Sequence, residues 1–482
     1  MPNSYLPNLD GIPDHLPKHV RIAQAIALDI SRGRLRAAEK LPGSRQLAQR
    51  LGVHRNTVNA ALRELISQGW LEARPARGYF VRLEESQAAT PRTLDPVEHN
   101  PGAAGYTLPP LPQSPLREKR GIPLSGGSPD PRHFPTIALA RAYRRVLSRH
   151  GTELLDYGKP YGEPRLRAHL AEMLRNQRGL TATSEHVLVT RGSQQAIWLA
   201  AHVLLKPGDR VAVEDLGYPP AWDALRNTGA SLVPLPVDEE GLRVDALQAA
   251  MNEQRIRAIY LTPQHQFPTT VALSPGRRLA LMALAADARL AVIEDDYAHE
   301  FHYAGRPRLP LASDDPTNQV IYVGSLSKVL APGLRIGYAV GSPEVIEQMG
   351  HLRAMCDYQG DNIGEAAVAE LIEDGELQRH MRRMRRVYET RRDHLVELLH
   401  STLPDDLSAS TPDGGLSLWV RVHHVRPALW SARCRALGVD LRAGEELSIT
   451  GQEVPYVRMS FSRLDCDELD HAVQLVRQAL PK

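Results

Sequence analysis

An amine, two hydroxyls and a guanidinium follow one predicted strand of this 482-residue chain. The segment Ser325-Leu-Ser-Lys328 comes directly after the apolar run 319–324, and Arg335 follows seven residues beyond the lysine. A lysine at a strand end can supply the amine of a Schiff base, and an arginine beside hydroxyls can hold a phosphate. The spacing predicts an amine and a phosphate clamp at one place.

A carboxylate and a glycine-containing loop lie upstream at comparable positions. The buried-strand pattern 290–297 ends in acidic residues, and Asp295 would meet a ligand at the carboxyl end of its strand. There it would keep a ring nitrogen protonated. The loop Arg191-Gly-Ser-Gln-Gln195 opens an apolar helix, whose free N–H groups suit a phosphate. A lysine, a carboxylate and a phosphate cup are the parts that pyridoxal phosphate chemistry requires.

The elements that position these residues belong to an α/β domain. Short β-type runs alternate with helical stretches from residue 124 onwards, at 186–190, 210–214, 256–262, 290–294, 319–324 and 337–340. This alternation predicts a mostly parallel sheet. Residues 83–120 lose periodicity and gather proline, which predicts an extended linker.

The N-terminal region has a helix-turn-helix pattern. Ile22, Ile26 and Ile30 form one helical stripe; Ser44 is predicted as an N-cap and Gly52 as the turn after a short helix. A second helix buries Val58, Ala61, Leu62 and Leu65, and the runs 71–74 and 78–81 predict a β-wing. The start of the second helix would enter the major groove, and its polar or basic residues are His54, Arg55, Asn56, Thr57 and Asn59. In the wing, Arg77 could reach a phosphate or the minor groove.

Composition bounds the class of protein. Lys and Arg number 58 against 56 Asp and Glu, yet residues 1–85 hold 13 against 8, a net +5, and the remainder is at −3. A basic module on an acidic body favours nucleic acid at that end. Three widely spaced cysteines exclude a disulfide framework and fit a reducing compartment. No apolar run approaches the ~20 residues of a membrane span, and the N-terminal prolines do not fit a secretory leader. We therefore expect a soluble, cytoplasmic protein with no membrane partner.

Residues 16–82 resemble the GntR-type winged helix. The matching segment is LPGSRQLAQRLGVHRNTVNAALRELISQGWLEARPARGYFV. The resemblance implies that Arg45 and the residues opening the second helix contact double-stranded promoter DNA. Gly43 stands where a small hydroxyl residue is common. The expected division is a DNA-binding domain over 1–82, a Pro-rich linker over 83–120 and an effector domain over 121–482.

Residues 121–480 resemble fold-type I aminotransferases. The matching segments are YGKPYGEPRLR, TRGSQQA, EDLGYPPAW, TPQHQFPT, VIEDDYAHEF, SLSKVLAPGLRIGY and YVRMSFS. The resemblance implies that Lys328 forms the Schiff base, Asp295 pairs with the pyridine nitrogen, Tyr297 bonds the ring hydroxyl and Tyr218 stacks on the ring. It assigns the phosphate to Gly192, Ser193, Gln194, Ser325 and Arg335, with Ser327 as a weaker candidate. Tyr157 would reach the phosphate of a neighbouring subunit, and Arg458 would bind an amino-acid carboxylate.

Two departures concern the loop His265-Gln-Phe-Pro-Thr-Thr270. Aminotransferases usually carry Asn at the position of Phe267, where it bonds the ring hydroxyl, and Gln266 or His265 is the alternative donor here. Thr270 replaces the usual glycine.

Two other patterns are assigned no site. His299 and His302, three residues apart, are interpreted as loop packing rather than metal ligands. The arginine run over 382–392 is interpreted as a solvated helix face.

The pairing of the two domains resembles the MocR/GabR family of bacterial transcription regulators. The resemblance implies a pyridoxal-phosphate-dependent regulator that binds promoter DNA and senses a small amino compound, or the cofactor itself, by forming an aldimine. It also implies a homodimer, head-to-tail and domain-swapped. Two alternatives stay open: an active aminotransferase with an accessory DNA-binding domain, and a repressor that responds to pyridoxal phosphate alone. The effector, the operator and the sign of regulation are open as well.

Overall fold

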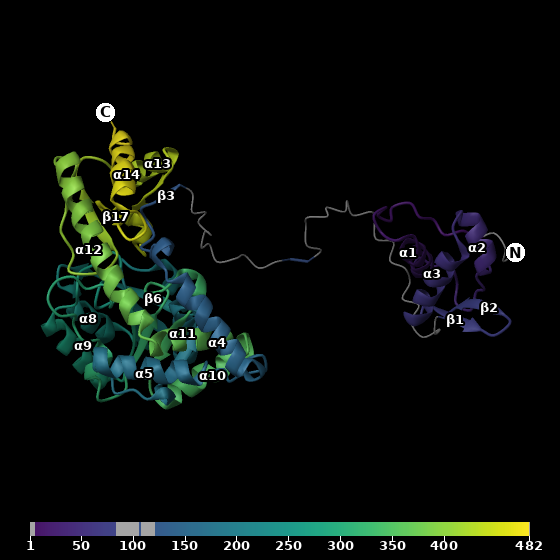
Figure 1. Cartoon of the computed structure of the whole chain (residues 1–482), viewed down its shortest axis with the longest axis horizontal. Helices are drawn as coiled ribbons and strands as arrows, with labels where there is room; N and C mark the ends of the chain where they lie inside the picture. Colours follow the sequence, from purple (N-terminus) through teal and green to yellow (C-terminus); the bar gives the residue numbers. More distant parts are fainter. Residues whose placement is uncertain (1–4, 83–105, 108–120, 482) are drawn as a thin grey trace. The chain divides into compact units, whose positions relative to one another are not determined.

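The computed structural model describes residues 5–82, 106–107 and 121–481. The chain divides into two compact units, one up to Pro110 and the other from Leu111 (Figure 1). The predicted linker lies outside the described residues, apart from 106–107. Across the described ranges, no helix is long and apolar enough to cross a membrane.

The first unit has the predicted helix-turn-helix and wing. Its elements are α1 (Lys18–Ser31), α2 (Ser44–Leu51), α3 (Arg55–Ser67), β1 (Leu71–Arg74) and β2 (Gly78–Val81). The predicted apolar stripes of α1 and α3 are buried against each other in one core. The two wing strands pair antiparallel, with Leu71 opposite Val81, and have the predicted bounds.

The two predicted ends of α2 have different outcomes. Gly52 ends the helix with φ +62°, in the left-handed region that suits glycine, as expected. The N-cap prediction for Ser44 is wrong, because the extended residue before the helix is Gly43 and Ser44 is the first helical residue. The Ser44 hydroxyl turns inward and accepts a hydrogen bond from Arg55 Nε at 3.3 Å, so it ties α2 to α3 instead of capping α2.

The second unit is built on a seven-stranded sheet. In spatial order its strands are β4 (Val187–Thr190), β12 (Gly337–Val340), β11 (Val320–Ser325), β10 (Ala291–Asp296), β9 (Ala258–Leu261), β5 (Arg210–Glu214) and β6 (Ser231–Leu235). Only β12 within this sheet runs antiparallel to its neighbours, and the other pairs are parallel. This confirms the predicted mostly parallel sheet; β6 is a strand that the sequence pattern did not indicate.

Helices cover both faces of this sheet. They are α5 (Pro164–Arg178), α6 (Ser193–Leu204), α7 (Pro219–Arg226), α8 (Val244–Glu253), α9 (Pro275–Ala288), α10 (Pro343–Cys356) and α11 (Asn362–Glu373), and α4 (Thr136–Leu154) packs on α11. Val211 and Val213 of β5 pack with α6, α7 and α10, whereas the intervening Ala212 packs with α8 and α9. This alternation follows from the two-residue period of a strand, and it buries both sides of the sheet.

A smaller sheet forms the C-terminal part of the second unit. Its strands, in order, are β13 (Leu407–Ala409), β14 (Ser417–Val422), β17 (Tyr456–Ser460) and β16 (Arg442–Ala443). It packs with α12 (Glu376–Thr402), α13 (Pro427–Ala436) and α14 (Cys466–Gln478) around one apolar core. Two short pairs complete the unit, β3 (Ile122–Pro123) with β15 (Val439–Asp440) and β7 (Val237–Asp238) with β8 (Gly241–Leu242). The first pair ties the start of this unit to its C-terminal region.

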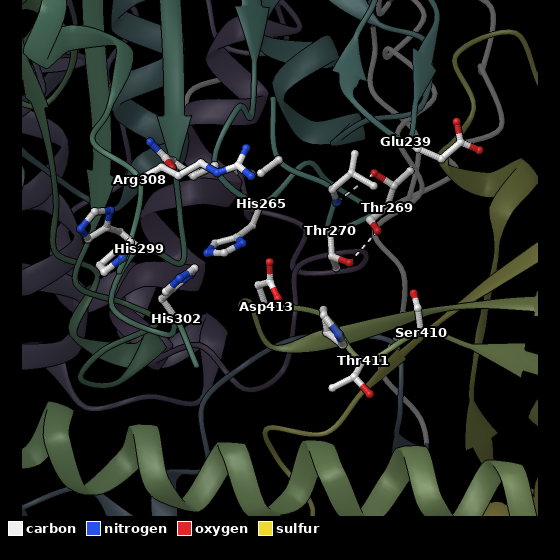
Figure 2. Close-up of a pocket in the computed structure, with 15 residues that line it drawn as sticks. Glu239, His265, Thr269, Thr270, His299, His302, Arg308, Ser410, Thr411 and Asp413 are labelled. Carbon is white, nitrogen blue, oxygen red and sulfur yellow. Dashed lines mark hydrogen bonds between the residues drawn. The ribbon is translucent and has the colours of Figure 1, made fainter. Parts of the chain in front are cut away.

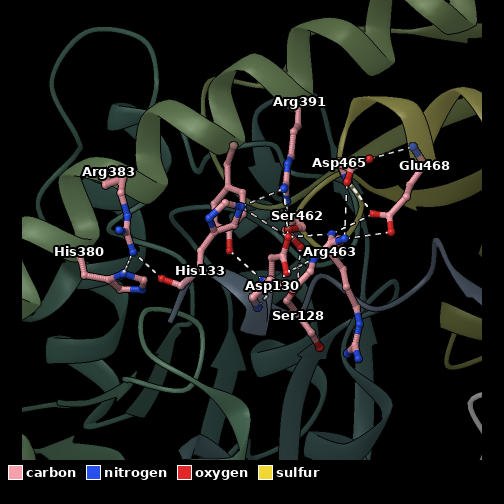
Figure 3. Close-up of polar contacts among 12 residues, drawn as sticks. Ser128, Asp130, His133, His380, Arg383, Arg391, Ser462, Arg463, Asp465 and Glu468 are labelled. Atoms are coloured by element: carbon pink, nitrogen blue, oxygen red, sulfur yellow. Dashed lines mark hydrogen bonds and ion pairs between the residues drawn. The ribbon is translucent and has the colours of Figure 1, made fainter. Parts of the chain in front are cut away.

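The arginine run of α12 is a solvated face only at its start. Arg382, Arg383 and Arg386 are exposed, but Arg391 and Arg392 are buried, so the prediction is wrong for the second half. Arg391 donates to Asp130 Oδ2 at 3.0 Å and to the Ser462 carbonyl at 2.9 Å (Figure 3). Burial alone would raise the pKa of Asp130, but hydrogen bonds from Arg132 and Arg391 hold it below its ordinary value. These residues fasten the segment after β3 to α12.

Candidate functional site

A cavity of about 310 Å³ lies where β10 and β11 end. It brings together six side chains that the sequence predicted, from segments far apart in the chain: Ser193, Tyr218, Asp295, Tyr297, Lys328 and Arg458. Asp295 is within the last residues of β10, and Lys328 follows β11. Carboxyl ends of adjacent parallel strands meet at one edge of a sheet, which explains the convergence.

Asp295 has one oxygen engaged and one available. Its Oδ2 accepts a hydrogen bond from Tyr260 at 2.8 Å, whereas Oδ1 is buried without a hydrogen-bond partner among the described residues. Burial raises the pKa of Asp295 to about 7; the hydrogen bond from Tyr260 opposes the shift, Asp296 adds to it, and the Lys328 charge opposes it. A buried oxygen of this kind requires a donor, and a protonated ring nitrogen supplies one.

The predicted phosphate ligands include Arg335, whose guanidinium donates to the Arg191 carbonyl at 2.8 Å. The Gly192 backbone lies so close to Arg335 that a Cβ there would be 3.2 Å from its guanidinium, and its φ of +79° also favours glycine. Ser193 begins α6, where backbone N–H groups are free for an anion. The Ser327 hydroxyl is buried and has no hydrogen-bond partner in the described part of the chain. These donors and the Arg335 charge suit a phosphate.

Two of the predicted phosphate ligands make contacts of their own. Gln194 donates its side-chain amide to the Pro220 carbonyl at 2.7 Å, which leaves its backbone N–H at the start of α6 for an anion. Ser325 is buried, and its hydroxyl accepts the Ser327 N–H at 3.2 Å.

Three aromatic residues line the cavity, Tyr218, Phe267 and Tyr297. Phe267 contacts Tyr218 edge-on with centroids 5.5 Å apart, and Tyr297 at 6.2 Å. Burial raises the pKa of Tyr297 to about 12 and also raises that of Tyr218, so both are neutral donors at neutral pH. The Arg458 guanidinium lies 4.5 Å over the Phe267 ring and donates to the Ser125 carbonyl at 3.0 Å. A flat, buried guanidinium held in this way can take a carboxylate.

The expected role of Gln266 does not fit its contacts. Its amide donates to the carbonyls of Leu216 and Phe267 at 2.7 and 2.6 Å, and its oxygen accepts from Thr269. Gln266 is 1% exposed and does not line the cavity, so it supports the loop rather than facing a ring hydroxyl. Thr270 has φ +67°, which explains why related loops carry glycine there.

His265 lines a second cavity of about 290 Å³, shown in Figure 2. His299 and His302 lie there with Asp413, and His299 Nδ1 is 3.2 Å from Asp296 Oδ2. Burial lowers the pKa of His265 to about 4, so its ring is neutral. Within the described residues, no group of three or more His, Cys, Asp or Glu could hold a metal. His299 and His302, which the sequence analysis interpreted as loop packing, have ordinary packing and pairing contacts.

Sequence reasoning missed part of the cofactor cavity. Its further lining residues include Ser125, Gly127, Thr262, Asp440 and Arg442. Lys328 Nζ donates to the Gly127 carbonyl at 3.1 Å, across 201 positions of sequence. The Gly-Gly pair at 126–127 was a local signal, since a glycine pair permits close backbone approach; Asp440 and Arg442 had no comparable signal.

The predicted DNA contacts lie on the first unit. Arg45, His54, Arg55, Asn56 and Arg77 are exposed, and Thr57 and Asn59 are half-buried. The His54 ring caps α3 by accepting the Asn56 N–H at 3.2 Å. The exposed members of this set, on α2, at the start of α3 and in the wing, are available to a groove.

Tyr157 lies outside the cavity of its own chain. It is 79% exposed and packs edge-on against Tyr358, with ring centroids 5.0 Å apart. It therefore takes no part in the site as this chain alone forms it.

Comparison with known proteins assigns both units. Residues 120–476 match the family of class I and II aminotransferases, and residues 18–81 match the gntR family of bacterial regulatory proteins. The chain is 32% identical to the probable rhizopine catabolism regulatory protein MocR of Rhizobium meliloti, over 84% of this chain and 82% of that protein. It is 30% identical to the HTH-type transcriptional regulator TauR of Rhodobacter capsulatus, over 95% and 96%.

Solved structures resemble the second unit. The α-aminoadipate aminotransferase LysN of Thermus thermophilus, complexed with N-(5'-phosphopyridoxyl)-L-leucine, has a TM-score of 0.70 at 30% identity, over 75% of this chain and 92% of its own. The kynurenine aminotransferase of Pyrococcus horikoshii has a TM-score of 0.70 at 29% identity, with the same coverage. The aminotransferase family and the donor set of the cavity together indicate pyridoxal phosphate as the cofactor. The chain therefore belongs to the MocR type of transcriptional regulators, in which a GntR-type winged helix is joined to an aminotransferase domain of class I and II.

Proposed function

We propose that this protein regulates transcription in response to a small amino compound, which its cofactor-loaded cavity binds. The observation that carries the proposal is the convergence of Lys328, Asp295 and Arg458 on one cavity, in a chain that also has an exposed basic helix-turn-helix. The promoter DNA contacts are assigned to the seven residues of the first unit described above.

Each cavity residue has a distinct task toward the cofactor and the compound. Bound pyridoxal phosphate supplies an aldehyde that combines with amines and a ring that withdraws electrons. The amine of Lys328 would hold the aldehyde, Asp295 would keep the ring nitrogen protonated, and Arg335 with the backbone N–H groups at the start of α6 would hold the phosphate. Tyr297 would donate to the ring hydroxyl, and Tyr218 would cover the ring. Arg458 pairs with the carboxylate of the compound.

The segment after the linker supports a route from cavity to DNA reader. The carbonyls of Ser125 and Gly127 accept from Arg458 and Lys328, the two groups that would engage the compound and the cofactor. Those groups lose or weaken their hold on the segment when they take new partners. Because β3 (Ile122–Pro123) immediately precedes this segment, the compound would act on the part of the second unit that follows the linker in sequence. The compound can change the balance between two arrangements of the regulator only if its affinity for one arrangement exceeds its affinity for the other.

A homodimer is part of this proposal. The exposure of Tyr157 suits a contact with the phosphate of a partner subunit, and two readers in one dimer would bind paired half-sites. We infer the head-to-tail, domain-swapped arrangement from the family resemblance alone. Action on promoter DNA implies a cytoplasmic location.

A second candidate is a working aminotransferase. The specific observation in its favour is that the cavity holds an amine, a ring-nitrogen partner and a carboxylate-binding arginine together. Phe267, packed beneath Arg458 at the position where aminotransferases usually carry Asn, favours the sensor.

The experiment that separates these functions is an absorbance titration of the cofactor-loaded protein with a panel of amino compounds. Wild type, Lys328→Ala and the exposed-lysine control Lys206→Ala are compared. We expect the visible band of the lysine-bound cofactor in wild type and in the control, and its absence in Lys328→Ala. A compound that changes the spectrum without releasing keto acid, and also changes promoter affinity, supports the sensor. Sustained keto-acid formation with unchanged promoter affinity would support the enzyme instead.

A further inference from the structure

The loop that precedes α6 is held from outside the cofactor cavity by the end of α10. Asp357, the residue directly after α10, accepts a hydrogen bond on Oδ2 from Gln195 Nε2 at 3.0 Å. The same oxygen lies 3.3 Å from Arg191 Nε. Asp357 does not line the cavity. Its two partners flank Gly192 and Ser193, to which the family resemblance assigns the phosphate.

Hydrogen bonds inside the loop connect this contact to Arg335. Gln195 uses its Oε1 to accept the Arg191 N–H at 2.8 Å, and the Arg191 carbonyl accepts from Arg335 Nη2, also at 2.8 Å. Hydrogen bonds in a connected series reinforce one another. The Asp357 carboxylate therefore orients the Gln195 amide, and Gln195 fixes the Arg191 backbone. That backbone in turn holds the guanidinium that is predicted to bind the phosphate.

Asp357 is itself fixed from the interior of the second unit. Arg353, one helical turn earlier on α10, is 0% exposed, and its Nε lies 3.5 Å from Asp357 Oδ1. The Arg353 guanidinium also donates to the carbonyls of Pro160 and Val189, the second of which belongs to β4. The carboxylate thus joins the loop to a buried side chain that is anchored on the large sheet. A group that positions others needs a rigid support of this kind.

The charge of Asp357 has a second effect, which acts in the opposite direction. A carboxylate near a phosphate repels it, so removal of Asp357 would strengthen phosphate binding if repulsion were the larger effect. The guanidiniums of Arg191 and Arg353 both lie within 3.5 Å of the carboxylate and weaken its field. We therefore expect the positioning effect to be the larger one. The sign of the change on substitution distinguishes the two effects.

We propose that Asp357 is a positioning residue for the phosphate group of the cofactor, and that it acts through Gln195 and Arg191. The inference rests on the proposed function for the phosphate ligands, and it adds a residue outside the cavity on which their arrangement depends. Donors that are held in place before binding lose less conformational freedom when the phosphate arrives, which raises their affinity for it.

The test is calorimetric titration of the full-length protein, freed of cofactor, with pyridoxal phosphate and with pyridoxal. The two probes share the ring and the aldehyde, so the ratio of their affinities isolates the phosphate. Wild type is compared with Asp357→Ala, Asp357→Asn and the control Asp374→Ala. Asp374 follows α11 as Asp357 follows α10, but it pairs with Arg145.

We expect wild type and Asp374→Ala to bind pyridoxal phosphate much more tightly than pyridoxal. Asp357→Ala should lower the ratio of the two affinities about tenfold, the effect of one hydrogen bond to a charged group. Its affinity for pyridoxal should not change, which also shows that the variant is folded. Asp357→Asn keeps an oxygen that can accept from Gln195, so it should retain part of the ratio.

A double-mutant cycle tests the route through the loop. If Asp357 acts through Gln195, Asp357→Ala should lower the ratio less in a Gln195→Ala background than in wild type. An equal loss in both backgrounds overturns that route and with it the proposal.

Three further outcomes of the titration would also overturn the proposal. The first is a ratio in Asp357→Ala equal to that of wild type, and the second is a higher ratio in both Asp357 variants, which would show repulsion. The third is an equal loss of affinity for both probes, which would show a general structural role. In all three cases the phosphate ligands of the proposed function stand. Those ligands fail, and the role of Asp357 with them, if wild type binds pyridoxal phosphate no more tightly than pyridoxal.

Discussion

Removal of the Tyr260 hydroxyl should raise the pH at which the protein binds its cofactor tightly. Tyr260 donates to Asp295 Oδ2 at 2.8 Å inside the core. Burial raises the pKa of Asp295 to about 7 even though this hydrogen bond lowers it. A hydrogen bond to a charged group contributes about 1.5–3 kcal/mol. At about 1.4 kcal/mol per pH unit, Tyr260→Phe should raise the pKa of Asp295 further, by about one to two pH units.

The ionised carboxylate is the form that holds a protonated ring nitrogen, so affinity for the cofactor should rise with pH through the pKa of Asp295. Near pH 7.5 most of the wild-type carboxyl groups are ionised. In Tyr260→Phe the ionised fraction, and with it the affinity, should be roughly three- to twenty-fold lower. The difference should disappear at a pH well above both values.

The assay is titration of cofactor-free protein with pyridoxal phosphate between pH 6.5 and 9.5, followed by absorbance. The chain offers a matched control in Tyr322→Phe, because Tyr322 donates to Asp296 Oδ2, also at 2.8 Å and also buried. Both tyrosines are on strands that flank β10, but Asp296 does not line the cavity. The reasoning would be refuted if both variants lost the same affinity for the cofactor. It would also be refuted if the pH at which cofactor affinity reaches half its maximum were the same in Tyr260→Phe as in wild type. Thermal melts establish that both variants are folded.

Three further predictions use other parts of the molecule. Burial raises the pKa of Glu214 to about 8, so its contribution to stability is complete below its ordinary pKa of 4.5 and is lost as the pH rises through 8. In chemical denaturation, the free energy of unfolding of Glu214→Gln should therefore rise relative to that of wild type as the pH goes from 5 to 9. A difference between the two proteins that does not change with pH would contradict the raised pKa of Glu214. Gly127→Ala should weaken binding of carboxylate compounds several-fold in the calorimeter, because its φ is +55° and a Cβ would lie 3.0 Å from Arg458 Nη2. The control Gly126→Ala, whose Cβ would be no closer than 3.7 Å to a neighbour, should bind as wild type does, and equal effects would refute the steric argument. Arg45→Ala and Arg55→Ala should each reduce the slope of log promoter affinity against log salt by about 1, whereas Arg34→Ala, whose side chain pairs with Asp29, should leave the slope unchanged; the idea fails if all three variants behave alike.

The sequence by itself determined the elements whose cause is local. The predicted bounds hold for the wing strands 71–74 and 78–81 and for the strand 210–214, and the predicted glycine ends α2. Strand periodicity and a left-handed turn could be predicted because both depend on neighbouring residues. Asp295 and Lys328 could be assigned for the same reason, since each follows from a strand end and a short motif.

The tertiary structure decided what depends on residues far apart in the chain. Arg458 meets Ser125 across 333 positions, and Arg391 meets Asp130 across 261, so no local pattern indicated these contacts or the burial of Arg391. The inward turn of Gln266 likewise depends on the carbonyl of Leu216, 50 residues away. Short motifs specify which side chains are present, but hydrogen-bond partners and cavity walls arise only when packing brings distant segments together. The second arginine of the cavity is of this kind, because strand pairing alone places Arg442 opposite Arg458.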